Sequence, residues 1–316
     1  MPERSDPMGR TRNVWPHRLA LLTAGATLPL LFIGGLVTSK GAGLAVPDWP
    51  TTFGYNMLLY PWSEMVGNIF YEHSHRLIAA SVGILTIVLC AALWLRETRS
   101  WVRWLGVGAL GLVIVQGVVG GLRVVLLEQT LAILHACLAQ AFFALAVALA
   151  VFTSGGWRET EQRISALHAT RFRFLCVFTT ALVYFQAVSG AVVRHTGSAL
   201  DLHVLLAFVV TLHVALVARR TWKFYRAQEK LRRPASILIA LLVSQLTLGV
   251  GSYLGKFSSF GAVWSRGLVV AITTTHVVAG ALLLVTCLVL TLRAFRFLAP
   301  AGSAEAAQFI SERSPA

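Results

Sequence analysis

Residues 71–76 read Tyr-Glu-His-Ser-His-Arg and stand where a polar segment passes into an apolar run that continues to about residue 95. A glutamate, two histidines and an arginine are costly to place at the edge of a hydrocarbon layer, so such a cluster marks a functional site by default. Other apolar runs of the chain repeat the histidine of this stretch. The cluster therefore indicates both where helices enter the membrane and where chemistry is expected.

The composition of the whole chain indicates a membrane protein. Hydrophobic residues make up 56% of the 316 residues and charged residues only 13%, which leaves too few polar side chains to cover a soluble globular domain. The formal net charge of +14 could suggest nucleic-acid binding, but the basic residues fall in short runs between apolar segments. Membrane topology explains this charge better, and we expect no nucleic-acid partner.

Eight apolar windows are long enough to cross about 30 Å of hydrocarbon, which takes roughly 20 helical residues. The run after the N-terminal arginines has no convincing small-residue cleavage site, so it is interpreted as a retained first helix and not as a signal peptide. The eight windows lie at about 19–38, 75–95, 103–122, 130–153, 173–193, 201–218, 235–255 and 268–292.

The distribution of positive charge predicts the orientation of these helices. With the N-terminus in the cytoplasm, all but six of the 27 Lys and Arg residues lie on the inner side, as the positive-inside rule requires. The six on the outer side are Lys40, Arg76, Arg123, Arg194, Lys256 and Arg266. We therefore expect eight spans with both termini in the cytoplasm.

The even-numbered apolar runs each begin with a histidine, which indicates a helical hairpin used four times. The histidines are His75, His135, His203 and His276. Three of the preceding runs carry a glutamine and a glycine four apart: Gln116 with Gly120, Gln186 with Gly190, and Gln245 with Gly249. The predicted fold is all-α, with two pseudo-symmetric four-helix bundles. Its expected parts are a cytoplasmic segment (1–18), a first bundle (19–153), a cytoplasmic linker (154–172), a second bundle (173–295) and a cytoplasmic tail (296–316).

The four repeated histidines are candidate ligands of a metal. A single histidine inside a membrane is as readily a helix–helix hydrogen bond, but four at equivalent depth on alternating helices favour another interpretation. Two facing imidazoles in each bundle would suit axial ligation of one haem iron. The expected pairs are His75 with His135 and His203 with His276, whereas His73, His195 and His213 receive no assigned role.

Charged side chains at the outer rim could complete each site. Arg76, Arg123, Arg194 and Arg266 are placed to meet haem propionates, although salt bridges or snorkelling would explain them equally well. Glu72 is different, because no other repeated histidine has an acidic residue three positions before it. It either caps the second helix or lies beside a haem, where a carboxylate can carry protons or stabilise developing positive charge.

These motifs together resemble those of the haem A synthase family, membrane enzymes that convert haem O to haem A. The resemblance spans nearly all of residues 19–295. It is carried by the Gly-Gly-Leu-Val-Thr-Ser-Lys-Gly-Ala-Gly-Leu-Ala-Val-Pro-Asp-Trp-Pro stretch (34–50), Glu-His-Ser-His-Arg (72–76), Leu134-His135, Val-Arg-His-Thr-Gly-Ser (193–198) and His276.

The resemblance implies an oxidoreductase that oxidises the C8 methyl group of haem O to a formyl group through hydroxylated intermediates, giving haem A for cytochrome oxidase. On this basis His75 and His135, with Arg76 and Arg123, would bind the haem O substrate in the first half. Glu72 would be the catalytic residue there.

The resemblance also implies a haem b cofactor in the second half, with His203 and His276 as axial ligands and Arg194 and Arg266 near its propionates. The expected partners are haem O, a haem O synthase (farnesyltransferase), an unidentified electron donor and the lipid bilayer; a homo-oligomer is left open. The expected location is the bacterial cytoplasmic (inner) membrane. Two departures stand out: the first external loop lacks the cysteine pair of some bacterial members, and His203 is followed by Val204 instead of arginine.

Two other functions remain open at this point. A dihaem b-type electron carrier could use the same four ligands without modifying either haem, although it would need no carboxylate in one half alone. A transporter also fits eight helices and internal repeats, but it would predict broken helices with polar sites at the midplane.

Overall fold

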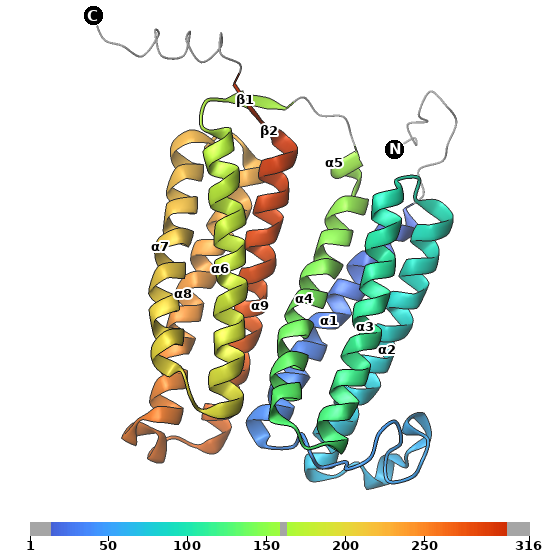
Figure 1. Cartoon of the computed structure of the whole chain (residues 1–316). Coiled ribbons are helices and arrows are strands. Elements are labelled where there is room, and N and C mark those ends of the chain that lie inside the picture. Colours follow the sequence, from blue (N-terminus) through green and yellow to red (C-terminus); the bar gives the residue numbers. More distant parts are fainter. Residues whose placement is uncertain (1–13, 159–162, 302–316) are drawn as a thin grey trace, which may run out of the picture.

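The structure is a computed structural model that describes residues 14–158 and 163–301, and it is dominated by long helices lying side by side (Figure 1). In this part of the chain eight helices are long and apolar enough to cross a membrane, which confirms the predicted multi-pass, mainly helical architecture. They are α1 (Trp15–Lys40), α2 (Gly67–Arg96), α3 (Ser100–Val125), α4 (Gln129–Thr153), α6 (Ala169–Thr196), α7 (Leu200–Phe224), α8 (Glu229–Phe257) and α9 (Arg266–Phe297). Each is one uninterrupted helix, unlike the broken helices that a transporter would predict.

Every helix extends beyond the apolar window that predicted it. Hydropathy marks only the segment that lies in hydrocarbon, whereas polar residues at both ends continue the same backbone hydrogen bonding. Helix α2 begins at Gly67, two turns before His75, and its N-cap is Val66. Glu72 therefore lies inside α2, and the interpretation of this residue as a helix cap is wrong.

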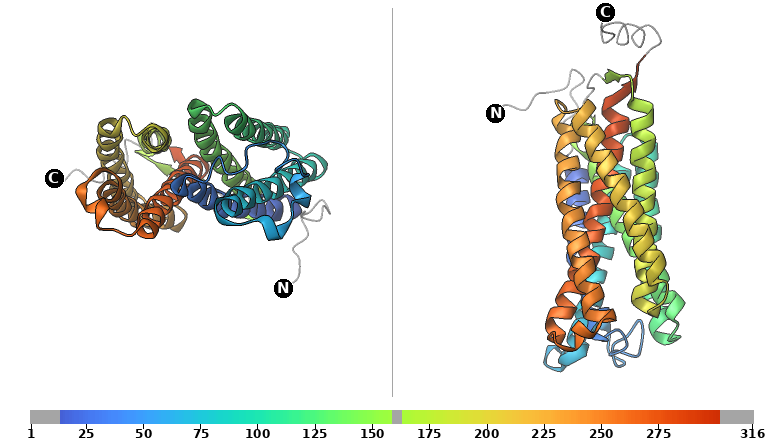
Figure 2. Two further views of the ribbon diagram at one scale, coloured as in Figure 1. Left: turned by 90° about the horizontal axis from the view of Figure 1, so that it is seen from below. Right: turned by 90° about the vertical axis from the view of Figure 1, so that its left-hand side faces the viewer.

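The helices form two groups of four that stand next to each other, α1–α4 and α6–α9 (Figures 1 and 2). Within each group successive helices are neighbours and the first also packs against the fourth. Each group encloses an apolar core, which includes Leu89 and Leu149 in the first and Leu238 and Leu290 in the second. Because lipid tails are as apolar as these side chains, close packing rather than exclusion of water holds such bundles together.

The two groups meet along a seam formed by α1 and α4 on one side and α6 and α9 on the other. The middle of this seam is apolar and contains Leu31, Phe143, Ala281 and Val285. At the end where α1 ends and α9 begins, the seam becomes polar. There Arg194 donates to the Gly35 carbonyl oxygen at 2.6 Å, and the Ser39 hydroxyl lies 3.2 Å from Thr273 and 3.1 Å from Thr274.

The connection between the two groups contains structure that the sequence did not predict. It includes a single helical turn, α5 (Gly155–Arg158), and a strand, β1 (Ile164–Ala166), which pairs in parallel with β2 (Leu298–Pro300). The all-α prediction therefore needs the addition of this two-stranded sheet, and α9 and β2 occupy the start of the predicted tail. Residues 302–316 of that tail and residues 1–13 lie outside the described residues.

A buried carboxylate ties the linker end of the first bundle together. Glu97, which follows α2, accepts hydrogen bonds from Arg99 at 2.9 Å and from Arg158 of α5 at 2.8 Å, and Arg99 also donates to the Phe152 carbonyl oxygen. Burial alone would raise the pKa of Glu97, but the hydrogen bonds from Arg99 and the charge of Arg158 hold it below its ordinary value. The carboxylate therefore joins the start of α3 to the end of α4 and to α5.

Candidate functional site

The structure brings the four repeated histidines together as two pairs. His75 on α2 faces His135 on α4, with ring centroids 6.4 Å apart and ring planes at 82°. His203 on α7 faces His276 on α9, again at 6.4 Å, with planes at 77°. In each bundle the two helices that carry the pair are diagonal partners, so the space between the imidazoles lies inside the bundle.

The spacing within each pair suits one metal atom between the rings. With about 2 Å from metal to each nitrogen, and roughly 1.2 Å from nitrogen to ring centre, the two centroids would lie a little over ~6 Å apart. Among the described residues, no group of three or more His, Cys, Asp or Glu side chains is placed to hold a metal ion. The chemistry of these donors therefore fits a haem, whose macrocycle supplies the remaining ligands.

A glycine on the preceding helix of the same bundle lies against each imidazole. A methyl group added at Gly120 would lie 2.7 Å from Cε1 of His135, and at Gly190 it would lie 3.0 Å from Cε1 of His203. The same contact is 3.1 Å for Gly34 with His75 and 3.3 Å for Gly249 with His276. Only glycine leaves this space, so the backbone of the preceding helix lies directly against the ring.

Gly34 completes the repeat in the first hairpin, where the sequence showed no glutamine–glycine pair. The signal in the sequence was the glycine alone, because Leu30 stands where the other hairpins have glutamine.

The ring nitrogens are only partly satisfied within the chain. His203 has the most partners, with Ser189 Oγ at 2.9 Å and Gln186 Nε2 at 3.2 Å from Nδ1. Nδ1 of His75, His135 and His276 is buried and, within residues 14–158 and 163–301, has no partner that meets the geometry of a full hydrogen bond. Buried polar atoms without partners are uncommon in stable structures, and they are expected where a ligand site is built.

Glu72 is buried beside the first pair and is held by two charged or polar donors. Its Oε1 accepts from Arg76 at 3.0 Å and its Oε2 from the Val46 backbone N–H, also at 3.0 Å. Only 4% of the residue is exposed. Since Glu72 precedes His75 by three positions in one helix, the two side chains share a face.

Arg76 has different partners from the haem carboxylates that the sequence suggested. Besides Glu72, its two terminal nitrogens donate to the carbonyl oxygens of Asp48 (2.7 Å), Thr51 (3.0 Å) and Val46 (2.9 Å). All three belong to the segment between α1 and α2, residues 41–66, which we call the long loop. The planar fork of an arginine can serve several acceptors at once, and here it fastens the long loop to α2.

His73, for which the sequence predicts no role, is a second residue that holds the long loop against α2. Its ring is 1% exposed, lies 3.2 Å from the Thr52 hydroxyl and packs on Tyr60 at 5.0 Å between ring centroids. It points to the other side of α2 from His75, because the two residues are two positions apart. The stretch 71–76 therefore contacts both the long loop and the histidine pair.

The long loop is also ordered from within by Asp48. Its carboxylate accepts hydrogen bonds from the Phe53 N–H at 2.8 Å, the Gly54 N–H at 2.9 Å and the Thr51 hydroxyl. Burial would raise the pKa of Asp48, but these hydrogen bonds, led by that of Gly54, lower it to about 2.

Two further contacts lay the loop over the first bundle. The Trp49 indole lies directly on Gly121 of α3, next to the glycine that contacts His135. Arg123, near the end of α3, donates to the Gly43 carbonyl oxygen at 3.1 Å. The loop thus covers the end of the first histidine pair.

The two remaining rim arginines differ in depth. Arg194 lies one turn beyond Gly190 and donates to Gly35, Ser39 and the Thr273 carbonyl oxygen across the seam. Arg266 starts α9 ten residues before His276, about 15 Å along the helix. The predicted contact of Arg266 with a haem carboxylate is therefore not favoured by its position.

Two other histidines have ordinary packing partners. His17 Nδ1 lies 3.0 Å from the Ala150 carbonyl oxygen, and His213 Nδ1 lies 2.9 Å from that of Val209, one turn before it. His195 ends α6, where its carbonyl oxygen accepts a hydrogen bond from Gln129 of α4. His213 is therefore hydrogen-bonded within its own helix.

Comparison with known proteins yields one consistent group of matches. The family model COX15-CtaA, described as cytochrome oxidase assembly protein, matches residues 17–202. The chain is 28% identical over 263 residues to a heme A synthase of Shouchella clausii (strain KSM-K16), covering 74% of this chain and 85% of that protein. It is 24% identical over 269 residues to a heme A synthase of Geobacillus kaustophilus (strain HTA426), covering 73% and 80%.

Proposed function

The chain belongs to the COX15-CtaA family of cytochrome oxidase assembly proteins, and from this we propose that it is a haem A synthase. The enzyme is an oxidoreductase that acts on haem O and converts it to haem A by oxidising the C8 methyl group to a formyl group. One observation carries the proposal: two matched histidine pairs are present, and among the described residues only the pair of His75 and His135 has a buried carboxylate one turn away in the same helix.

We assign the second pair to a resident haem b. His203 and His276 would hold this haem, and the backing glycines Gly190 and Gly249 bring the backbone of the preceding helix against the two imidazoles. When bound, such a haem supplies one-electron redox chemistry. Among the rim arginines, Arg194 is the one at a suitable depth for its propionates, one turn beyond Gly190.

We assign the first pair to the haem O substrate. The asymmetry between the helices supports this, because α2 begins about two turns before His75 whereas α7 begins only three residues before His203. The acidic residue nearest to His203 in sequence is Asp201, which is exposed and only two positions away, so it does not share the histidine's face. A half that only holds a cofactor needs no buried carboxylate, whereas a half that performs chemistry does.

Glu72 would act on protons at the substrate. Oxidation of a methyl carbon to the level of a formyl group passes through a carbon with two hydroxyls, which then loses water. Glu72 would accept the proton of one hydroxyl and return it to the departing one, so that the carbon becomes the formyl group. Arg76 and the Val46 N–H would hold the Glu72 carboxylate in place for this proton transfer.

Arg76 and Arg123 would then have different duties. The terminal nitrogens of Arg76 are occupied by Glu72 and by three carbonyl oxygens of the long loop, so we assign it to positioning Glu72. Arg123 lies three residues beyond Gly120 and makes a single hydrogen bond with the loop, to Gly43. It is the better placed of the two to meet a propionate of the substrate.

We place the protein in the bacterial cytoplasmic membrane with the linker end inside. Helix α1 begins and α9 ends at that same end of the molecule (Figure 1), and most of the basic residues outside the spans belong there by the positive-inside rule. The long loop and both histidine pairs then lie towards the outer face. A farnesyltransferase that makes haem O would supply the substrate, and a separate electron donor would reduce the enzyme.

The test is production of haem A by the whole chain. The protein is co-expressed with a haem O-producing farnesyltransferase, and the membrane haems are extracted and separated by chromatography. Haem A or hydroxylated haem O should appear with the wild-type chain and disappear with His75→Ala. Unmodified haem b in both halves, with no product under any reductant, would instead identify a dihaem electron carrier.

A further inference from the structure

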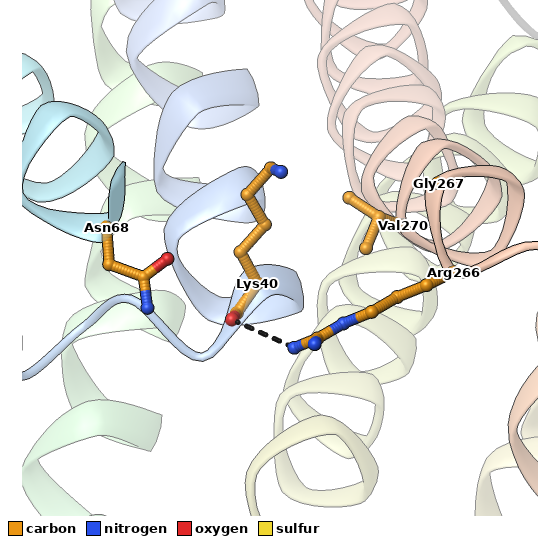
Figure 3. Close-up of a pocket in the computed structure, with 5 residues that line it drawn as sticks. All are labelled: Lys40, Asn68, Arg266, Gly267 and Val270. Carbon is orange, nitrogen blue, oxygen red and sulfur yellow. Dashed lines mark hydrogen bonds between the residues drawn. The ribbon is translucent and has the colours of Figure 1, made fainter. Parts of the chain in front are cut away.

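A cavity of about 370 Å³ lies at the end of the seam where α1 ends and α9 begins, and none of the four paired histidines lines it. Figure 3 shows the residues that do. It is lined by Lys40 at the end of α1, Asn68 in the first turn of α2, and Arg266, Gly267 and Val270 at the start of α9. Its size falls within the range of small-molecule sites. Because α1 and α2 belong to the first bundle and α9 to the second, the cavity joins the two halves.

The lining of this cavity suits an anion. It contains two cations and no acidic side chain. The Lys40 ammonium also lies over the Tyr71 ring at 4.5 Å, and Arg266 reaches the Lys40 carbonyl oxygen at 3.5 Å, so both cations are held on the cavity wall (Figure 3). Gly267 in the first turn of the long helix α9 adds the positive end of the helix dipole.

A carboxylate of either haem does not fit this position. Arg266 lies about 15 Å along α9 from His276, and Arg194 lies between the cavity and the second pair on the seam, with its own partners. On the first side, Glu72 and Arg76 pair with each other and with the long loop. The anion that the cavity recognises must come from the surroundings of the protein.

We propose that this cavity binds the phosphate group of an anionic phospholipid from the surrounding leaflet. The cavity lies where the apolar span α1 ends and α9 begins, and lipid phosphates lie at the level of such span ends. Arginine and lysine on both sides of a phosphate form strong charge-assisted hydrogen bonds, and basic pockets between membrane helices recognise lipid head groups in this way. The bound lipid clamps α1 and α2 to α9 and so braces the two halves. The inference is independent of the haem assignments.

The experiment uses the full-length protein purified in detergent. Its thermal unfolding is followed by tryptophan fluorescence after adding phosphatidylglycerol, phosphatidylcholine with the same acyl chains, or inorganic phosphate. Native mass spectrometry counts the phosphatidylglycerol molecules retained. Three variants are compared with the wild type: Lys40→Gln with Arg266→Gln, Asn68→Asp, and Lys256→Gln, which removes an exposed cation from the same end of the molecule but outside the cavity.

Phosphatidylglycerol should raise the Tm of the wild type and of Lys256→Gln by about 2–4 °C, as expected for a ligand at a modest excess over its Kd. The Lys40→Gln/Arg266→Gln variant should lose at least half of this shift and one retained lipid. If that variant does not fold, Asn68→Asp keeps the test sharp, because an added negative charge should also abolish the shift. An equal shift with phosphatidylcholine, an equal shift with inorganic phosphate alone, or an unchanged response of the cavity variants would overturn the proposal.

Discussion

In the first half of the molecule the long loop lies over the end of the bundle that carries His75 and His135, whereas in the second half the equivalent connection, from α6 to α7, consists of residues 197–199 alone. The pairs themselves are alike, with the same 6.4 Å between ring centroids and a glycine against each ring. The repeat therefore accounts for how a haem would be held. What surrounds the pair decides whether the haem is held or changed.

The stretch 71–76 is where this difference is concentrated. Glu72, His73 and Arg76 all contact the long loop, while His75 belongs to the pair. In the second half the positions before His203 hold no buried acid, and Val204 follows it in place of arginine. The residues around His75, within about one helical turn, therefore distinguish a candidate catalytic site in the first half from a binding site in the second.

The largest effect should come from removing the carboxylate that only the first half has. Glu72→Gln should reduce haem A formation by on the order of 100-fold, because a positioned proton acceptor contributes at least that much. The haem of the second half should remain, with an unchanged visible spectrum. Glu128→Gln, at the exposed N-cap of α4 in the same half, serves as the control; a similar loss there would show that the effect is not specific to the Glu72 carboxylate.

A smaller but substantial effect is expected at Arg76. Removing one partner of a buried ion pair costs roughly 3–5 kcal/mol, because the other charge is left unpaired. Arg76→Gln should therefore loosen the long loop and lower haem A formation roughly in proportion to the fraction of detached loop. Arg76→Lys should rescue only part of it, since an ammonium cannot serve four acceptors in one plane. Limited proteolysis measures the loop directly, and unchanged protection of residues 41–66 would contradict the role given to Arg76.

The glycine contacts allow a graded comparison of the two halves. Gly120→Ala, whose added methyl would lie 2.7 Å from the His135 ring, should disturb the first pair more than Gly249→Ala, at 3.3 Å, disturbs the second. Overpacking of this kind costs roughly 1–3 kcal/mol. Gly117→Ala is the matched control, because nothing lies within 4 Å of the methyl that it would add. The effect is measured as haem content and Tm. Equal values for all three variants would contradict the proposal that these glycines position the histidine rings.

The smallest effect concerns acid stability of the long loop, which has no counterpart in the second half. The folded pKa of Asp48, about 2, is below its ordinary value of 3.8, so its ionised form stabilises the loop above about pH 4 and this contribution is lost as the pH falls towards 2. Cleavage by pepsin within residues 41–66 should therefore rise between pH 4 and pH 2. Asp48→Asn should make the cleavage nearly independent of pH over this interval; an unchanged pH profile in that variant would exclude Asp48 as its cause.

Much of the architecture was predictable from residue types. The eight spans and the four histidines follow from hydropathy and from the repeat, and the structure pairs those histidines as expected. Gly34 was missed because Leu30 breaks the glutamine–glycine pattern, although its contact is made by the glycine. Spacing in one helix could suggest that Glu72 shares a face with His75, but no local pattern reveals that Arg76 donates to carbonyl oxygens more than twenty residues earlier.

The linker sheet was missed for a similar reason. Strands β1 and β2 are three residues each and lie more than 130 positions apart, so no periodicity could mark them. Long-range pairing of short segments is decided by the packed helices that bring them together, and it becomes visible only in three dimensions.

The haem content of two double variants tests most directly whether the two halves of the protein hold different haems. Each variant is purified after co-expression with the farnesyltransferase, and its haems are identified by chromatography and counted per chain. His75→Ala/His135→Ala should retain one haem b and lose haem O and haem A, whereas His203→Ala/His276→Ala should lose haem b. Loss of the same haem from both variants, or haem b in whichever half is intact, would contradict the division of labour proposed for the two halves.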